Sequence, residues 1–220
     1  MRSPIHPEAF PFTVIFAFGS YIFNYLGKSF PFLGRLFKSI GYMFSILALF
    51  TLYFFRDPER VIPQDENAIV SPADGTVLKI DDVPNAPFFN GPAKRVAIFL
   101  SIFNVHINRS PINGKIVYRN YNPGKFFPAN LDKASEDNEQ NSIGITDGDF
   151  KVLVRQIAGI IARRIICWNN PGDALEKGER FGLIRFGSRT ELYMPPGTTI
   201  EVKPGQKVQG GSTVIARRKK

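Results

Sequence analysis

The chain changes character near residue 56, and this change limits what it can fold into. Two Phe-rich apolar segments, residues 10–26 and 36–55, come first. Short β-branched runs separated by Gly, Pro, Asn and Asp follow. Long apolar segments predict helices, whereas short runs between turn residues are typical of strands. We therefore expect an N-terminal helical hairpin over residues 1–55 and a mainly β domain over residues 56–220.

The second part of the chain predicts a barrel-sandwich-like β domain. The phrases ADGTV, PPGTTIEVKPGQKV and GGSTVIA join short apolar runs through Gly-rich turns, as barrel-sandwich modules do. The acidic and polar stretch 132–142 predicts an exposed loop. Eight runs are expected to form strands: Val96–Ile102, Lys115–Tyr118, Val152–Ile157, Arg164–Cys167, Arg180–Phe186, Glu191–Met194, Thr199–Val202 and Thr213–Ala216.

The two apolar segments indicate attachment to a membrane. The second is close to the ~20 residues that span a bilayer, and the first is shorter and interrupted by Asn24. A secretory signal peptide and a buried hairpin of a soluble protein are the alternatives. Two full spans would put the basic connection (Lys28, Arg35, Lys38) opposite the β domain, and the positive-inside rule would then keep that domain out of the cytoplasm. We therefore prefer a peripheral or monotopic hairpin, with both ends on the cytoplasmic face of the cell membrane.

The charge balance is consistent with an anionic membrane. Lys and Arg number 28 against 19 Asp and Glu, a formal net charge of +9, and the C-terminal residues 217–220 are all basic. The 21 Phe, many of them in the first 55 residues, favour a membrane over nucleic acid as the anionic partner. The single Cys167 excludes an internal disulfide, and the two distant histidines, His6 and His106, argue against a His-rich metal site.

Two polar residues of the second part could carry chemistry. Asp74 is the one acid of the turn Ser71-Pro72-Ala73-Asp74-Gly75, and Asp before Gly also simply suits a turn. His106 follows an apolar run and is the only His after residue 6. It could be a hydrogen-bonded structural residue, but it is also the best proton carrier of the chain near neutral pH.

The pair Gly187-Ser188 admits a particular self-cleavage reaction. A Ser hydroxyl can attack the carbonyl of the preceding residue, and Gly at that position permits strained backbone angles. The amide becomes an ester, elimination cuts the chain, and hydrolysis with loss of ammonia leaves a pyruvoyl group on the new N-terminus. Such a ketone condenses with an amine substrate and accepts the electrons released by decarboxylation.

Five motifs in one order carry a resemblance to a known family. They are Phe55-Arg56-Asp57-Pro58, the turn Ser71–Gly75, the stretch Leu100–Pro111, Gln156-Ile157-Ala158-Gly159 with Ala162-Arg163-Arg164-Ile165, and the stretch Gly178–Arg189. Over about residues 36–220 the chain resembles the phosphatidylserine decarboxylase proenzymes, most closely their short form. The resemblance implies self-cleavage at a Gly-Ser bond, a covalent pyruvoyl group as cofactor, and conversion of phosphatidylserine to phosphatidylethanolamine. Archaetidylserine is the substrate of similar short relatives.

The sequence departs from the better-known long forms in two places. These forms are cut within Leu-Gly-Ser-Thr, and Gly211-Ser212-Thr213 matches those letters better than Gly187-Ser188-Arg189 does. We choose Ser188, because it leaves a fragment of 33 residues with several strands, whereas Ser212 would leave nine. Many long forms also have a second His three places after the first, where this chain has Arg109. The role of that second histidine must therefore fall on His106 or on another group.

The resulting hypothesis assigns roles by this resemblance. Asp74 and His106 activate Ser188 for cleavage, His106 protonates the carbanion left by carbon dioxide, and Arg163 and Arg164 are candidate phosphate contacts. Cleavage gives residues 1–187 and 188–220, which remain partners in one enzyme acting on a serine phospholipid. The alternatives are a non-enzymatic membrane-tethered adaptor and a pyruvoyl enzyme for a soluble amino acid. The apolar N-terminus argues against the second.

Overall fold

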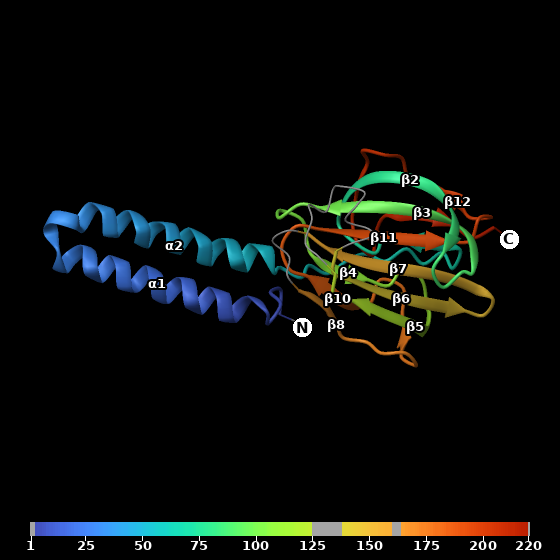
Figure 1. Cartoon of the computed structure of the whole chain (residues 1–220), viewed down its shortest axis with the longest axis horizontal. Coiled ribbons are helices and arrows are strands. Elements are labelled where there is room, and N and C mark those ends of the chain that lie inside the picture. The colour runs from blue at the N-terminus through green and yellow to red at the C-terminus, as the bar shows by residue number, and fades with distance from the viewer. Residues whose placement is uncertain (1–2, 125–137, 160–163, 220) are drawn as a thin grey trace. The chain divides into compact units, whose positions relative to one another are not determined.

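The computed structural model describes residues 3–124, 138–159 and 164–219. It divides into two units, Met1–Glu59 and Arg60–Lys220, the first helical and the second built of strands (Figure 1). The expected fold class, a mainly β domain preceded by a helical hairpin, is confirmed, and the largest sheet curls into a half-barrel. Each unit is described separately.

The first unit is a hairpin of two helices, α1 (Ala9–Ser29) and α2 (Gly34–Phe54), joined by the short 3₁₀ helix η1 (Pro31–Leu33). Figure 1 shows the two long helices running side by side. The Ser20 and Ser45 hydroxyls hydrogen-bond between them at 2.7 Å. At Gly41 an added Cβ would lie 2.4 Å from Asn24 Nδ2, so the close approach of the helices requires glycine there.

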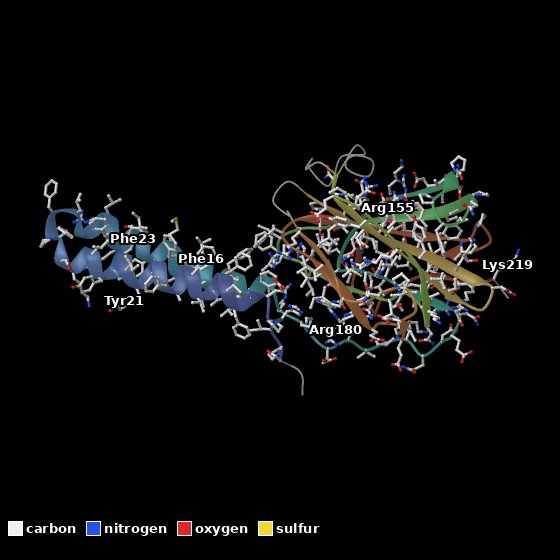
Figure 2. The ribbon with its side chains drawn as sticks, turned by 60° about the horizontal axis from the view of Figure 1, so that its bottom comes forward. Phe16, Tyr21, Phe23, Arg155, Arg180 and Lys219 are labelled. Carbon is white, nitrogen blue, oxygen red and sulfur yellow. The ribbon has the colours of Figure 1, made fainter. Side chains whose placement is uncertain are left out.

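The outer surface of the hairpin is apolar. Of the 22 exposed large hydrophobic side chains in the described chain, 16 lie between Phe10 and Tyr53, and Tyr21 is one of those that stand out from the helices in Figure 2. Both helices are long and apolar enough to cross a membrane by length and composition. Each has 21 residues, or roughly 31 Å at 1.5 Å per residue. An apolar outer surface of this kind is consistent with the expected attachment to a membrane.

The described residues of the second unit form three antiparallel sheets. The largest has the order β13-β2-β3-β11-β7-β6-β5-β9, and the smaller ones are β4-β10-β8 and β1-β14-β12 (Figure 1). The strands are β1 Ala68–Val70, β2 Gly75–Ala86, β3 Gly91–Leu100, β4 Ile107–Arg109, β5 Gly114–Asn122, β6 Gln140–Asp147, β7 Phe150–Ala158, β8 Ile165–Cys167, β9 Ala174–Leu175, β10 Arg180–Ile184, β11 Ser188–Met194, β12 Thr199–Ile200, β13 Lys207–Val208 and β14 Val214–Arg217.

Strand β11 lies in the middle of the large sheet. It pairs with β3 over residues 188–194 and with β7 over residues 188–193. Alternate residues face the apolar core, where Leu192 meets Ile98 and Val154 in one cluster of buried side chains. Every expected strand has a counterpart in the structure, with ends shifted by a few residues. The β-branched runs between turn residues therefore located these eight strands correctly.

The prediction of an exposed loop over residues 132–142 is wrong where the structure describes it. Residues 138–142 are buried, Asn138 completely and Gln140 to 8% exposure, and β6 begins at Gln140. Their polar groups find partners inside the domain: Asn138 Nδ2 donates to Ala158 O at 2.7 Å. Burial of polar residues is tolerated when they are hydrogen-bonded, and composition alone does not reveal such partners. Residues 132–137 lie outside the described part.

A buried ionic network lies on the face of β11 that is turned away from the core. Glu191 is fully buried and contacts Arg189 Nη2 at 2.7 Å, while Tyr193 Oη donates to its other oxygen at 2.6 Å. Arg95 of β3 lies 3.5 Å from Glu191 and binds Asp81 of β2 at 2.6 Å. Glu191 and Arg189 follow Ser188 in the chain, whereas Arg95 and Asp81 precede it. The network therefore joins the two predicted fragments.

Candidate active site

The bond predicted to be cut follows two residues with unusual backbone angles. Phe186 has φ 56° and Gly187 has φ 47°, both in the left-handed region. Glycine adopts this region readily, whereas a residue with a Cβ is strained there by about 1–2 kcal/mol. Phe186 is one of three non-Gly residues with positive φ in the described chain, the others being Phe88 and Asn90. Strain of this kind persists where the surrounding structure holds it, and such places are often reactive sites.

Ser188 itself is enclosed by the sheet. It is the first residue of β11, opposite Leu100 of β3 and Ala158 of β7, and it is fully buried. Its Oγ has no hydrogen-bond partner among the described residues. Leaving a buried hydroxyl unsatisfied costs about 1–3 kcal/mol. A buried and unsatisfied hydroxyl directly after a strained peptide unit is a suitable starting arrangement for attack on the Gly187 carbonyl.

The other Gly-Ser pair has a different environment. Gly211 also has a positive φ of 79°, but Ser212 is only half-buried. It lies in a turn, where its N–H donates to Gln209 O at 3.2 Å. Only β14 follows it, so a fragment starting there would hold a single strand in place. These features favour Ser188 over Ser212 as the reactive serine.

His106 is buried immediately before β4, with 2% of its surface exposed. Its Nδ1 lies 3.0 Å from Asn104 O. A carbonyl oxygen can only accept, so Nδ1 carries a proton, and in the neutral imidazole Nε2 then keeps the lone pair. The backbone O of His106 accepts a bond of 3.2 Å from Ile184 N, at the end of the strand that leads to Ser188. His106 therefore has the tautomer of a general base and lies beside the segment that ends in the scissile bond.

Asp74 lies in the turn between β1 and β2. Its carboxylate binds Arg60 Nη2 at 2.8 Å and accepts a bond of 2.8 Å from Gly210 N. The turn is attached to β4 because Pro72 O accepts a bond of 2.9 Å from Arg109 N. Asp74 also lines a cavity of about 410 Å³ with Asn104, the residue whose carbonyl orients His106. The fold thus brings the Asp74 turn beside the His106 strand, while orientation of the imidazole by Asp74 stays a prediction.

Arg109 does not take the place of a second histidine near Ser188. Within β4, Asn108 faces the side of Thr190, and alternation turns Arg109 to the opposite side. There its Nη1 donates to Gly178 O at 3.0 Å. Arg109 is buried and supports the loop that precedes β10, so it is a structural residue in this arrangement.

A chain of buried amides next to Ser188 escaped the sequence analysis. Asn108 Nδ2 donates to Thr190 Oγ1 at 3.3 Å, and Gln156 Nε2 donates to Asn108 Oδ1 at 2.8 Å. Asn141 Nδ2 then donates to Gln156 Oε1 at 2.8 Å, and Arg119 Nε to Asn141 Oδ1 at 3.3 Å. Because a guanidinium can only donate, Arg119 fixes the direction of every bond in the chain. The position of Thr190, two residues after Ser188, is set by this network.

A second cavity, of about 380 Å³, lies between β5, β6 and β8. Arg119 and Arg164 line it together with Tyr121 and Glu139. The structure thus gives Arg164 a place that suits the predicted anion contact, whereas Arg163 lies outside the described residues. No group of three or more His, Cys, Asp or Glu that could hold a metal ion occurs within the parts of the chain described above.

Comparison with known proteins identifies the family. The family model described as phosphatidylserine decarboxylase matches residues 47–216. The chain is 52% identical over 172 residues to a phosphatidylserine decarboxylase proenzyme of Symbiobacterium thermophilum, covering 78% of this chain and 80% of the relative. It is 45% identical over 214 residues to the proenzyme of Citrifermentans bemidjiense, covering 97% and 96%. The chain belongs to the phosphatidylserine decarboxylase family.

Membership in the phosphatidylserine decarboxylase family confirms the resemblance drawn from the five motifs and does not favour the adaptor alternative. The relatives are named proenzymes, which fits a covalent group made from the chain itself. The surroundings of Ser188 are suited to forming such a covalent group. Its unsatisfied buried Oγ and the left-handed Gly187 fit a serine that is consumed to make a pyruvoyl cap. Sequence reasoning missed Arg60 and the buried amides, because nothing in the local sequence separates them from surface residues.

Proposed function

We propose that this chain is the precursor of a membrane-bound phosphatidylserine decarboxylase that cuts itself before Ser188. The mature enzyme converts phosphatidylserine to phosphatidylethanolamine. One observation carries the proposal: in a member of this family, a buried serine with an unsatisfied Oγ follows two left-handed residues at the start of a central strand. The chain is thereby an enzyme of phospholipid synthesis, made as a zymogen.

For cleavage, His106 Nε2 takes the proton of the Ser188 hydroxyl, and Oγ attacks the carbonyl carbon of Gly187. The carboxylate of Asp74 stabilises the positive charge on the imidazole, as in a hydrolytic triad. The Gly187–Ser188 amide becomes an ester. Loss of the Ser188 α-proton then breaks the Cβ–Oγ bond and frees the Gly187 carboxylate. Water replaces the nitrogen of residue 188 as ammonia, which leaves a ketone on the new N-terminus.

The pyruvoyl group, once formed, supplies a ketone that condenses with the substrate amine and accepts the electron pair released with carbon dioxide. The residues of the chain do the rest. His106 returns a proton to the carbon that has lost carbon dioxide, and Arg164 binds the phosphate, with Arg163 as a further candidate. The two chains, 1–187 and 188–220, stay together because β11 pairs with both β3 and β7.

The hairpin attaches the enzyme to the cell membrane. Its two ends are tied together by backbone hydrogen bonds, Asp57 N to Pro4 O at 2.7 Å and His6 N to Phe55 O at 2.8 Å, so both emerge on the same face. We place that face in the cytoplasm, where anionic lipids attract a basic chain. Helices of roughly 31 Å must tilt strongly to stay within one leaflet.

Three variants of the full chain test the proposed cleavage. Ser188→Ala should remain a single uncut chain without decarboxylase activity. Asp74→Asn and His106→Ala should both accumulate precursor, and the double variant should cut little more slowly than either, since members of one catalytic unit are not additive. The measurement is intact mass over hours on folded, monodisperse protein. A nine-residue fragment would move the cleavage to Ser212, and complete cutting of both variants would leave Asp74 and His106 as structural residues.

A second arm of this experiment separates the two reactions and the substrates. If His106→Ala is cut at the wild-type rate but releases no carbon dioxide, His106 acts in decarboxylation alone. Phosphatidylserine vesicles, archaetidylserine vesicles and free serine in solution are compared as substrates for the mature enzyme. Activity on free serine equal to that on lipid would support the soluble amino-acid alternative. A preference between the two lipids would identify the lipid core.

A further inference from the structure

The cavity between β5, β6 and β8 contains a carboxylate with an unused oxygen. Glu139 is buried, with 4% of its surface exposed. Its Oε1 accepts two bonds, from Tyr121 Oη at 3.1 Å and from Ile165 N at 3.2 Å. Its Oε2 is buried and has no hydrogen-bond partner among the described residues. An ionised oxygen in that position is unfavourable unless a donor meets it, and a cationic donor suits it best.

The neighbours of Glu139 reinforce the demand for a cation. Burial, together with the hydrogen bond to Glu139 and its charge, raises the pKa of Tyr121, so the phenol stays neutral and donates its proton to the carboxylate. Neither Glu139 nor Arg164 forms a salt bridge within the described part of the chain. Among the described residues, the cavity is therefore lined by a carboxylate, Glu139, and by a guanidinium, Arg164, that form no salt bridge.

Sheet register brings this carboxylate close to the reactive serine. Ser188 lies opposite Ala158, and Ala158 N donates to Glu139 O at 3.0 Å, so the three residues form one row across β11, β7 and the start of β6. Facing residues of neighbouring strands project to the same side. With strands about 4.8 Å apart, the Cα atoms of Ser188 and Glu139 are about 10 Å apart. Between them lies Ala158, whose methyl group packs with Ile184 and Ile165 in a small apolar cluster.

We propose that Glu139 Oε2 is the acceptor for the ammonium group of the serine headgroup, and that Arg164 binds a negative group of the same headgroup. This inference rests on the proposed function and assigns its substrate recognition. A phosphoserine headgroup carries one ammonium and two anionic groups within a few bonds, which matches a carboxylate and a guanidinium that line one cavity. Glu139 thereby selects lipids with a primary amine over phosphatidylglycerol or phosphatidic acid, and it holds that amine on the face of the sheet that carries residue 188.

Binding to the uncut chain tests the assignment without turnover. Full-length Ser188→Ala protein in detergent is titrated with glycerophosphoserine and, as a control, with glycerophosphoglycerol, by calorimetry. Glycerophosphoserine should bind, and adding Glu139→Gln should weaken it about tenfold to a hundredfold, as expected for loss of a charged hydrogen bond. Glycerophosphoglycerol should bind more weakly than glycerophosphoserine, and Glu139→Gln should not change its affinity. The matched control Glu66→Gln removes the same charge from an exposed position and should change neither affinity.

Arg164→Gln, at an exposed position, is the second variant and tests the cation. If Arg164 binds phosphate, the variant should weaken glycerophosphoserine and glycerophosphoethanolamine equally; if it binds the carboxylate, only the serine ligand should weaken. No loss with either ligand removes Arg164 from the proposal. Absence of glycerophosphoserine binding, or equal binding by the Glu139→Gln and Glu66→Gln proteins, overturns the assignment of Glu139. Wild-type protein that still cuts itself and decarboxylates lipid would then leave the proposed function intact.

Discussion

Replacing Gly187 with Ala isolates the contribution of backbone conformation to self-cleavage. An added Cβ would meet nothing closer than Ile102 Cγ2 at 3.9 Å, so the substitution causes no clash. Its only direct effect is to place a residue with a Cβ at φ 47°, at a cost of about 1–2 kcal/mol. The segment can relax to negative φ instead. The reactive conformation should then be populated about 5- to 30-fold less, since 1.36 kcal/mol corresponds to a factor of ten.

The assay is the rate at which precursor disappears, followed by intact mass after refolding or synthesis. Gly187→Ala should cut about 5- to 30-fold more slowly yet reach completion. Gly148→Ala is the matched control: its φ is also positive, at 59°, and nothing lies within 4 Å of the added Cβ. It should lower the free energy of unfolding by a similar amount and leave the cleavage rate unchanged. Cleavage of Gly187→Ala at the wild-type rate would refute the role of the left-handed conformation.

Three further predictions concern the membrane, acid stability and the buried amides. The double variant Phe18→Asp, Ile46→Asp changes one exposed position on each helix, 63% and 66% exposed. It should abolish flotation with anionic vesicles, because each Asp costs about 2.5 kcal/mol or more in a bilayer. The control Val61→Asp, at an exposed position of the β domain, should leave flotation unchanged. Asp81 has a lowered pKa, chiefly through its hydrogen bond with Arg95; the stability that it adds is present above its ordinary value of 3.8 and is lost as the pH falls further. Asp81→Asn should therefore flatten the loss of urea resistance on acidification, and an unchanged loss would assign it to other carboxyls. Gln156→Leu in the Ser188→Ala precursor leaves Asn108 and Asn141 unsatisfied and should lower the free energy of unfolding by roughly 2 kcal/mol or more, against no change for exposed Gln209→Leu.

Sequence patterns predicted eight of the strands, because a β-branched run between turn residues is a local signal. They missed β2, whose second half contains Asp81, Asp82, Pro84 and Asn85, residues typical of turns. The structure accommodates them because only Gly75 and Thr76 of β2 pair with β13, and because the ladder with β3 is irregular between Val83 and Ala86, where Pro84 and Asn85 lie. An edge position depends on the order of strands in the sheet, which a single sequence does not reveal.

For the candidate site, the sequence indicated the residues with distinctive chemistry and missed those that support them. Asp74, His106 and Ser188 stand in recognisable motifs, and the fold gathers the strands that carry them. The φ of Phe186 and the register that aligns Glu139 with Ser188 are properties of the folded backbone. Glu139 also lay in a stretch whose polar composition predicted exposure. Polar residues that are buried through hydrogen bonds to one another look like surface residues until their partners are known.

The central position of β11 has a consequence for the lifetime of the cleaved enzyme. Before cleavage, unfolding is unimolecular and the chain can return to its native state alone. After the proposed cleavage at Ser188, complete unfolding would release a peptide of 33 residues, and recovery would become a bimolecular association that depends on dilution. The strand would have to re-enter between β3 and β7, in the interior of an eight-stranded sheet. The lifetime of the mature enzyme should therefore be set by a slow rate of unfolding. At cellular dilution, a molecule that has unfolded completely should not refold.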